Sequence, residues 1–248
     1  ERFDIILSSA DPLTTYSLIE EETRPDAFEN YTPTFSKAAV HLKLESLPPI
    51  TAFEKIGRTG PQQYQGSIDL RPDLESLKKS YKSLCKDGLL FAPGTVVSSH
   101  IPTACDETVA NGQSGHLWSL FLHTVPALYK RGNWNGEGQK DLLDATLDKV
   151  RMVAPEVDSY IEDIKIITPT EIVETYGAKT ASGAHLPMSP EYLFEDRPFA
   201  GSCGYKTPLE NLFLCGAGSP ANGTVTGLGG YNCAKLVIAK HGSLNHAA

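Results

Sequence analysis

The chain has 248 residues, a length that suits one large domain or two small ones and is ample for a hydrophobic core. Apolar residues make up 40% of the sequence and charged residues 21%, which is ordinary for a globular protein. The net charge of −8 gives no support to a nucleic-acid partner.

The opening of the chain predicts a buried parallel strand over residues 3–9, because a continuous apolar run stops at the turn before Pro12. A short helix is expected over residues 14–22. The chain begins directly before a strand, and we expect that an upstream part is missing or supplied elsewhere.

Residues 36–47 alternate between apolar and polar positions, which is typical of a half-solvated antiparallel strand. The apolar face holds Ala38, Val40, Leu42 and Leu44, and the other holds Lys37, Ala39, His41, Lys43 and Glu45. Further strands are expected over residues 65–70, 95–101, 116–124 and 161–167. The strand over 116–124 looks mostly buried on both faces, and Trp118 and Phe121 are expected in the core.

Helices are predicted over residues 72–86, 140–153 and 169–176 from apolar residues that recur at helical spacing. The expected core stripes are Leu74, Leu77, Tyr81 and Leu84 in the first, and Leu142, Leu143, Leu147, Val150 and Val153 in the second. Residues 178–208 show no period but hold aromatic and apolar side chains, which predicts packed irregular chain. The last predicted elements are a strand from Leu212, a glycine-rich turn and a helix.

This layout predicts an α+β or α/β fold. A mixed, mainly antiparallel sheet with helices is expected between two pieces of an incomplete Rossmann-like nucleotide-binding domain. The expected divisions are residues 1–22, 23–208 and 209–248, with the first and last in the nucleotide-binding part and the middle in a substrate-binding domain.

The glycine-rich turn, Gly216–Ala221, formally matches G-x-G-x-x-A after a strand. As a primary dinucleotide fingerprint it fails, because no acidic residue follows Glu210 to hold a ribose. The small residues from Thr224 to Gly230 instead indicate a helix N-terminus whose amides approach a close neighbour. That neighbour is either a ligand or another stretch of backbone.

The residues Gly204–Lys235 (GYKTPLENLFLCGAGSPANGTVTGLGGYNCAK) resemble the C-terminal flavin-binding stretch of the phytoene desaturase-like FAD-dependent oxidoreductases, the carotenoid and retinoid oxidoreductase group. The opening FDIILSSADPLTTYSLI and the stretch SKAAVHLKLESLPPI resemble other parts of the same family. The resemblance covers nearly the whole chain but only the C-terminal portion of a family member.

The resemblance implies a flavoprotein whose FAD is held first by an N-terminal strand–GxGxxG–helix, which this sequence does not contain. The second FAD contact carries over to Gly216, Ala217, Gly218, Val225, Thr226 and Gly227. FAD is therefore expected for the complete protein, whereas this chain alone is not expected to hold it tightly. The implied reaction is hydride transfer between FAD and an apolar, polyene- or isoprenoid-like substrate.

The expected partners are this substrate and an N-terminal FAD-binding half, a partner chain or a second copy in a homo-oligomer. His185 is the candidate catalytic residue, as a proton donor, although a hydrogen-bonded loop histidine is the simpler interpretation. Arg197 is expected in a salt bridge.

One departure from the family's sequence supports an alternative function. The family usually has His-Pro-Gly-Gly-Gly where this chain has Pro220–Thr224. The alternative is a non-catalytic binding or scaffold protein that has lost FAD.

The five cysteines are widely spaced, so neither a disulfide framework nor a metal site is expected. No apolar run reaches the roughly 18 residues of a membrane span, and no secretory signal is visible. A cytoplasmic or organelle-matrix protein without a transmembrane segment is the resulting prediction.

Overall fold

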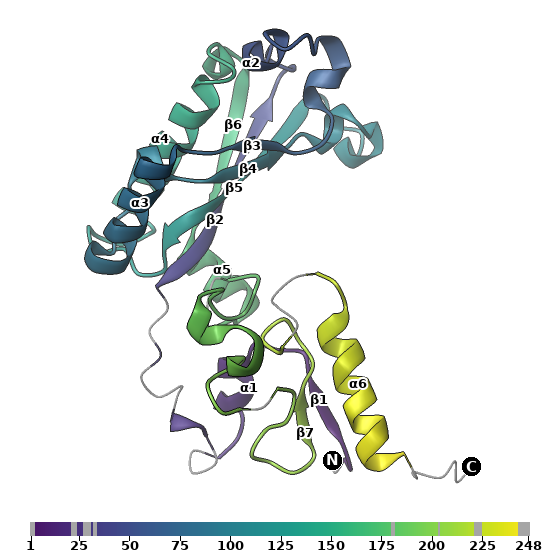
Figure 1. Ribbon diagram of the computed structural model, residues 1–248. Helices are drawn as coiled ribbons and strands as arrows, with labels where there is room; N and C mark the ends of the chain where they lie inside the picture. The colour runs from purple at the N-terminus through teal and green to yellow at the C-terminus, as the bar shows by residue number, and fades with distance from the viewer. Residues whose placement is uncertain are drawn as a thin grey trace. The chain divides into compact units, whose positions relative to one another are not determined.

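The computed structural model describes residues 3–20, 24–26, 31, 34–179, 182–202, 204–220 and 225–242. The chain divides into two compact units, one of Glu1–Pro33 with Tyr176–Ala248 and one of Thr34–Thr175. The described residues form a small parallel strand pair, a five-stranded antiparallel sheet and six α-helices (Figure 1). This confirms the mixed α/β fold class. The assignment of the parts to flavin and substrate domains stays a prediction.

The unit Thr34–Thr175 is built on an antiparallel sheet with the strand order β3-β4-β5-β2-β6. Its strands are β2 (Phe35–Leu44), β3 (Ile68–Leu70), β4 (Val97–His100), β5 (His116–Pro126) and β6 (Ile161–Ile167). All five predicted strands of this region are therefore confirmed, with ends that differ by a few residues.

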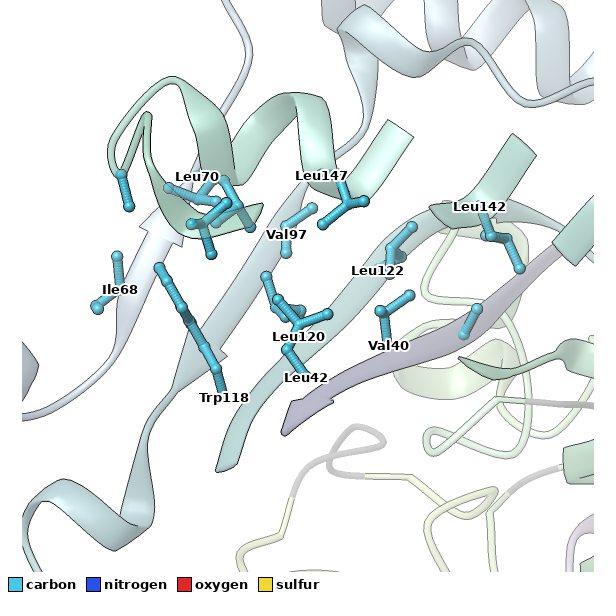
Figure 2. Close-up of a cluster of buried hydrophobic side chains, with 14 of the residues drawn as sticks. Val40, Leu42, Ile68, Leu70, Val97, Trp118, Leu120, Leu122, Leu142 and Leu147 are labelled. Carbon is cyan, nitrogen blue, oxygen red and sulfur yellow. The ribbon is translucent and has the colours of Figure 1, made fainter. Parts of the chain in front are cut away.

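The core of this unit lies between the sheet and α4 (Glu137–Arg151), as Figure 2 shows. Alternate residues of β2 and β5 are buried there, because successive side chains of a strand point to opposite faces. The predicted inward residues Ala38, Val40, Leu42 and Leu44 are all buried, and so is Trp118. The helices α2 (Thr51–Glu54), α3 (Leu74–Lys82) and α5 (Pro169–Tyr176) complete the unit.

The predicted apolar stripe of α3 is wrong at two positions. Leu74 and Tyr81 are 65% and 60% exposed, whereas Ser80 is fully buried. Ser80 lies against Gly94, where an added Cβ atom would overlap both the Ser80 side chain and the backbone of Ser76. A close approach of two backbones, which needs small residues, therefore replaced the expected leucine contact.

The other unit holds the parallel pair β1 (Ile6–Ser8) and β7 (Leu212–Leu214), with α1 (Pro12–Ser17) and α6 (Leu228–His241). Strands of parallel type were expected at both ends of the chain, but the predicted burial of the first strand is wrong. Ile6 and Leu7 are each 50% exposed, whereas β7 is buried throughout. α1 begins earlier than expected because Asp11 caps it, accepting a hydrogen bond from the Thr14 amide at 2.9 Å.

The described part of residues 178–208 contains short 3-10 turns at Pro190–Tyr192 and Phe194–Asp196 and one isolated β-bridge, from Lys206 to Phe213, as expected for packed irregular chain. None of the helices in the described ranges is long and apolar enough to cross a membrane. Those ranges also contain no group of three residues able to hold a metal ion, and Cys85, Cys105, Cys215 and Cys233 are free thiols.

Candidate functional site

The glycine-rich turn continues directly from β7. This strand pairs with β1 in the register Ile6↔Leu212, Leu7↔Phe213 and Ser8↔Leu214. The pairing extends by one more bond, from the Cys215 amide to the Ser8 carbonyl at 2.8 Å. The turn through Pro220 thus begins at the carboxyl end of a parallel strand pair, where open α/β sheets bind ligands. Residues 221–224 lie outside the described part of the chain.

Three glycines of this region are explained by close contacts with the chain itself. A Cβ atom on Gly216 would overlap the carbonyl oxygen of Ser9, and one on Gly218 would overlap the ring of Pro12. A Cβ atom on Gly229 would lie 3.0 Å from the Gly216 carbonyl oxygen. Backbone carbonyls therefore lie against Gly216 and Gly229, and the Pro12 ring lies against Gly218. For Gly229, backbone is one of the two neighbours that the sequence left open for the start of the helix.

The N-terminus of α6 is different, because its residues are exposed. Gly227 caps the helix with φ of +73°, a left-handed conformation that favours glycine, and no described atom lies within 4 Å of its Cβ position. Val225 is fully exposed, and Thr226 and Gly227 are exposed as well. The amide of Leu228 donates to Thr226 Oγ1 at 3.3 Å, but no described residue accepts from the amides of Gly229 and Gly230.

These amides carry the positive end of the helix macrodipole. The exposed tip can therefore hold a negatively charged or electron-rich edge of a ligand. Of the residues predicted to contact a cofactor, Val225, Thr226 and Gly227 lie at this open tip. Gly216 and Gly218 lie in the packed turn behind it, and the Gly216 carbonyl meets the first turn of α6 at Gly229.

Arg197 fixes the turn from the other side. Its side chain is fully buried, and its Nε and Nη2 donate to the Ala217 carbonyl at 3.2 and 2.9 Å. It also donates to the carbonyls of Ala184, Pro187 and Tyr192. The expected salt bridge is not present among the described residues, because backbone carbonyls take all these bonds. Burial lowers the pKa of this guanidinium from its ordinary value.

His185, the candidate proton donor, packs against the same turn. Its Cε1 lies 3.2 Å from the position of a Cβ on Gly216, and its backbone has φ of +64°. Burial lowers the pKa of His185, and the positive charge of Arg197 lowers it further. The negative charge of Asp11 acts in the opposite direction and raises it. The ring is therefore neutral at neutral pH. The structure brings His185 together with Gly216 and Gly218, and a catalytic role stays a prediction.

Two residues shape this region in ways that were not predicted from the sequence. Asp11 is buried and caps α1, and Arg197 joins the irregular loop to the turn. An Asp directly before Pro12 is a recognisable helix start, so the first could have been found. Nothing in the local sequence around Arg197 indicates four carbonyl partners.

Comparison with known proteins gives a distant relationship. No known family profile matches the chain. The protein named pyridine nucleotide-disulfide oxidoreductase domain-containing protein 2 of Rattus norvegicus is 27% identical over 245 residues, which cover 96% of this chain and 42% of that protein. The protein of the same name from Mus musculus gives the same identity and coverage.

The fold and the comparisons therefore define a mixed α/β protein that is distantly related to proteins named for an oxidoreductase domain. The particular relative, pyridine nucleotide-disulfide oxidoreductase domain-containing protein 2, is homologous over nearly the whole chain. The chain spans about two fifths of the length of each of these two relatives, 42%.

Proposed function

We propose that this chain is the C-terminal part of a flavin-dependent oxidoreductase that acts on an apolar, polyene- or isoprenoid-like substrate by hydride transfer to or from FAD. The observation that carries the proposal is the exposed N-terminus of α6, which follows a parallel strand pair and a tightly packed glycine turn. The distant relationship to oxidoreductase-domain proteins supports it.

The residues present fit a flavin at the helix tip. The amides of Gly229 and Gly230 would face its electron-rich pyrimidine edge, with Val225, Thr226 and Gly227 beside it. Gly216, Ala217 and Gly218 would set the spacing of the turn behind. A bound flavin accepts or donates a hydride, and the positive end of a helix stabilises negative charge on the reduced ring. The neutral imidazole of His185 would offer its one N–H as a donor near the turn.

A further stretch of polypeptide is part of the proposal. Parallel strands are normally covered on both faces, and a two-stranded pair is too small to be stable alone. β1 nevertheless leaves half of Ile6 and Leu7 exposed. We propose that a segment with the strand–GxGxxG–helix, either in the same polypeptide or in a partner chain, covers this strand and holds the phosphates of FAD.

The alternative function is a non-catalytic binding or scaffold protein of the same origin. It is supported by the contacts that explain Gly216, Gly218 and Gly229 without any ligand. The altered Pro220–Thr224 turn favours it too, although its residues 221–224 lie outside the described part.

A flavin titration separates the two functions. FAD is added to the purified full chain, and flavin fluorescence and anisotropy are measured up to millimolar FAD. Thr226→Glu places a carboxylate at the tip, where it competes with the flavin but is favourable for the helix dipole. Ala234→Glu adds the same charge at an exposed position farther along α6.

The proposed function predicts weak binding that Thr226→Glu abolishes and Ala234→Glu retains. Both variants are expected to keep the thermal stability of the original chain. No binding at millimolar FAD, or equal binding by both variants, would favour the scaffold alternative.

A further inference from the structure

The five-stranded sheet carries a pocket of about 430 Å³ on the face opposite the α4 core. Its floor is formed by outward residues of β2, β5 and β6, which alternate with the buried ones. Its rim is the chain between Thr103 and His116. The volume lies in the range of small-molecule sites, roughly 300–1,000 Å³. The whole pocket belongs to the unit Thr34–Thr175.

Basic side chains outnumber acidic ones in the pocket lining. Two lysines and two histidines, Lys43, Lys165, His41 and His116, line it together with one carboxylate, Asp163. Lys43 is already paired with Glu162 at 2.8 Å. Lys165 forms no ion pair with any described residue, so its ammonium group is available to a ligand.

His41 is held in a fixed position beside Lys165. Its Nδ1 lies 3.0 Å from Oγ of the buried Ser119, and its ring meets Phe121 edge-on at 6.0 Å. Burial lowers the pKa of His41, and Lys165 and His100 lower it further. Its Nε2 has no hydrogen-bond partner in the described part of the chain.

The same pocket offers apolar surface. Val109, Leu117 and Ile167 line it beside the basic groups. A ligand with only a charged group would leave this surface uncovered, and a purely apolar ligand would leave the Lys165 ammonium group and His41 Nε2 without a partner. The lining therefore suits a molecule that has both parts.

We propose that this pocket binds an amphipathic anion, with a carboxylate or phosphate head group at Lys165 and His41 and an apolar chain against Leu117 and Ile167. The inference rests on the proposed function only in taking this ligand as the substrate. It narrows the substrate class from an apolar molecule to one that ends in an anionic group.

The test compares octanoate, octyl phosphate and octanol by calorimetric titration of the full chain without flavin. At least one anion is expected to bind roughly tenfold more tightly than octanol, the size of one charge-assisted hydrogen bond. The better of the two anions identifies the head group. Equal binding of octanol and both anions would overturn the proposal.

Lys165→Met removes the charge, and His41→Gln removes the imidazole while keeping a polar group for Ser119. Each is expected to lose most of the preference for the anion. Lys37→Met is the matched control, because Lys37 is an exposed lysine of the same strand as His41 and does not line the pocket. An anion preference that survives in Lys165→Met, or disappears equally in Lys37→Met, would contradict the site. FAD is absent from this assay, so a failed flavin titration would leave its result unchanged.

Discussion

Arg197 and Ala217 are joined by two hydrogen bonds, from Nε and Nη2 of the guanidinium to one carbonyl oxygen. Arg197 lies in the irregular loop and Ala217 in the glycine-rich turn, so this pair connects two segments that are distant in sequence. Because the guanidinium is fully buried, its hydrogen bonds to carbonyls replace the water it has lost. The turn before α6 is thereby held by the loop that contains His185.

Arg197→Met should destabilise the loop and the turn together. The change removes the donor from the carbonyl of buried Ala184 and from the carbonyls of half-buried Tyr192 and Ala217, and a buried unsatisfied group costs about 1–3 kcal/mol. We expect a loss of about 1–3 kcal/mol. Hydrogen exchange measured by mass spectrometry on peptides from residues 182–220 should accelerate accordingly.

Arg71→Met is the matched control, because Arg71 forms an exposed pair with Asp69 at 2.9 Å. Exposed pairs contribute less than about 1 kcal/mol. Similar exchange rates in the original chain and in Arg197→Met would show that the carbonyl bonds do not hold the loop.

The adjacent glycines Gly229 and Gly230 should respond differently to alanine. Alanine is better than glycine in a helix by about 1 kcal/mol. At Gly230 the nearest atom to the new Cβ is 3.9 Å away, so the full gain is expected. At Gly229 the Cβ meets two backbone carbonyls, at 3.0 and 3.3 Å, which offsets that gain. Urea unfolding should find Gly230→Ala more stable than Gly229→Ala by about 1 kcal/mol or more.

Ser99→Ala should weaken the core of the five-stranded sheet. Ser99 Oγ accepts from Trp118 Nε1 at 3.0 Å and donates to the Ile68 carbonyl at 2.9 Å. Both side chains are fully buried, so alanine leaves the indole N–H without a partner, and we expect a loss of about 1–3 kcal/mol. The loss of stability can be measured by denaturation monitored through tryptophan fluorescence. Ser98→Ala, on the outward face, should change stability little, and an equal loss there would contradict the prediction.

Stability should fall as the pH drops below the ordinary histidine pKa of 6.5. Burial lowers the pKa of His41, His123 and His185 below that value. The unfolded chain therefore binds protons that the folded chain does not, and stability is fully present above pH 6.5 and is lost as the pH falls through the folded pKa values.

Urea midpoints measured between about pH 5 and 8 should show this decline before the carboxylates titrate. His123→Gln should make it shallower. A midpoint that stays constant down to pH 5 would contradict the prediction.

Much of the fold could be predicted, because the spacing of apolar residues and the positions of turn residues are local properties of the sequence. The alternation in β2 placed Val40 and Leu42 in the core, and β6 and α5 begin and end where the sequence indicated. The parallel type of the first and last strands was also indicated by their continuous apolar character, although their pairing with each other was not predicted. These features depend on neighbours along the chain, which a sequence displays directly.

Tertiary contacts decided the rest. The sequence indicated a close neighbour for the glycines at the start of α6, but only the structure identified the Gly216 carbonyl as the neighbour of Gly229. The carbonyl partners of Arg197 and the meeting of His41 with Lys165 depend on loops and strand register, which bring together residues far apart in the chain. The path of the backbone, rather than the residue type, decides which of these residues come into contact. No local sequence pattern encodes that path.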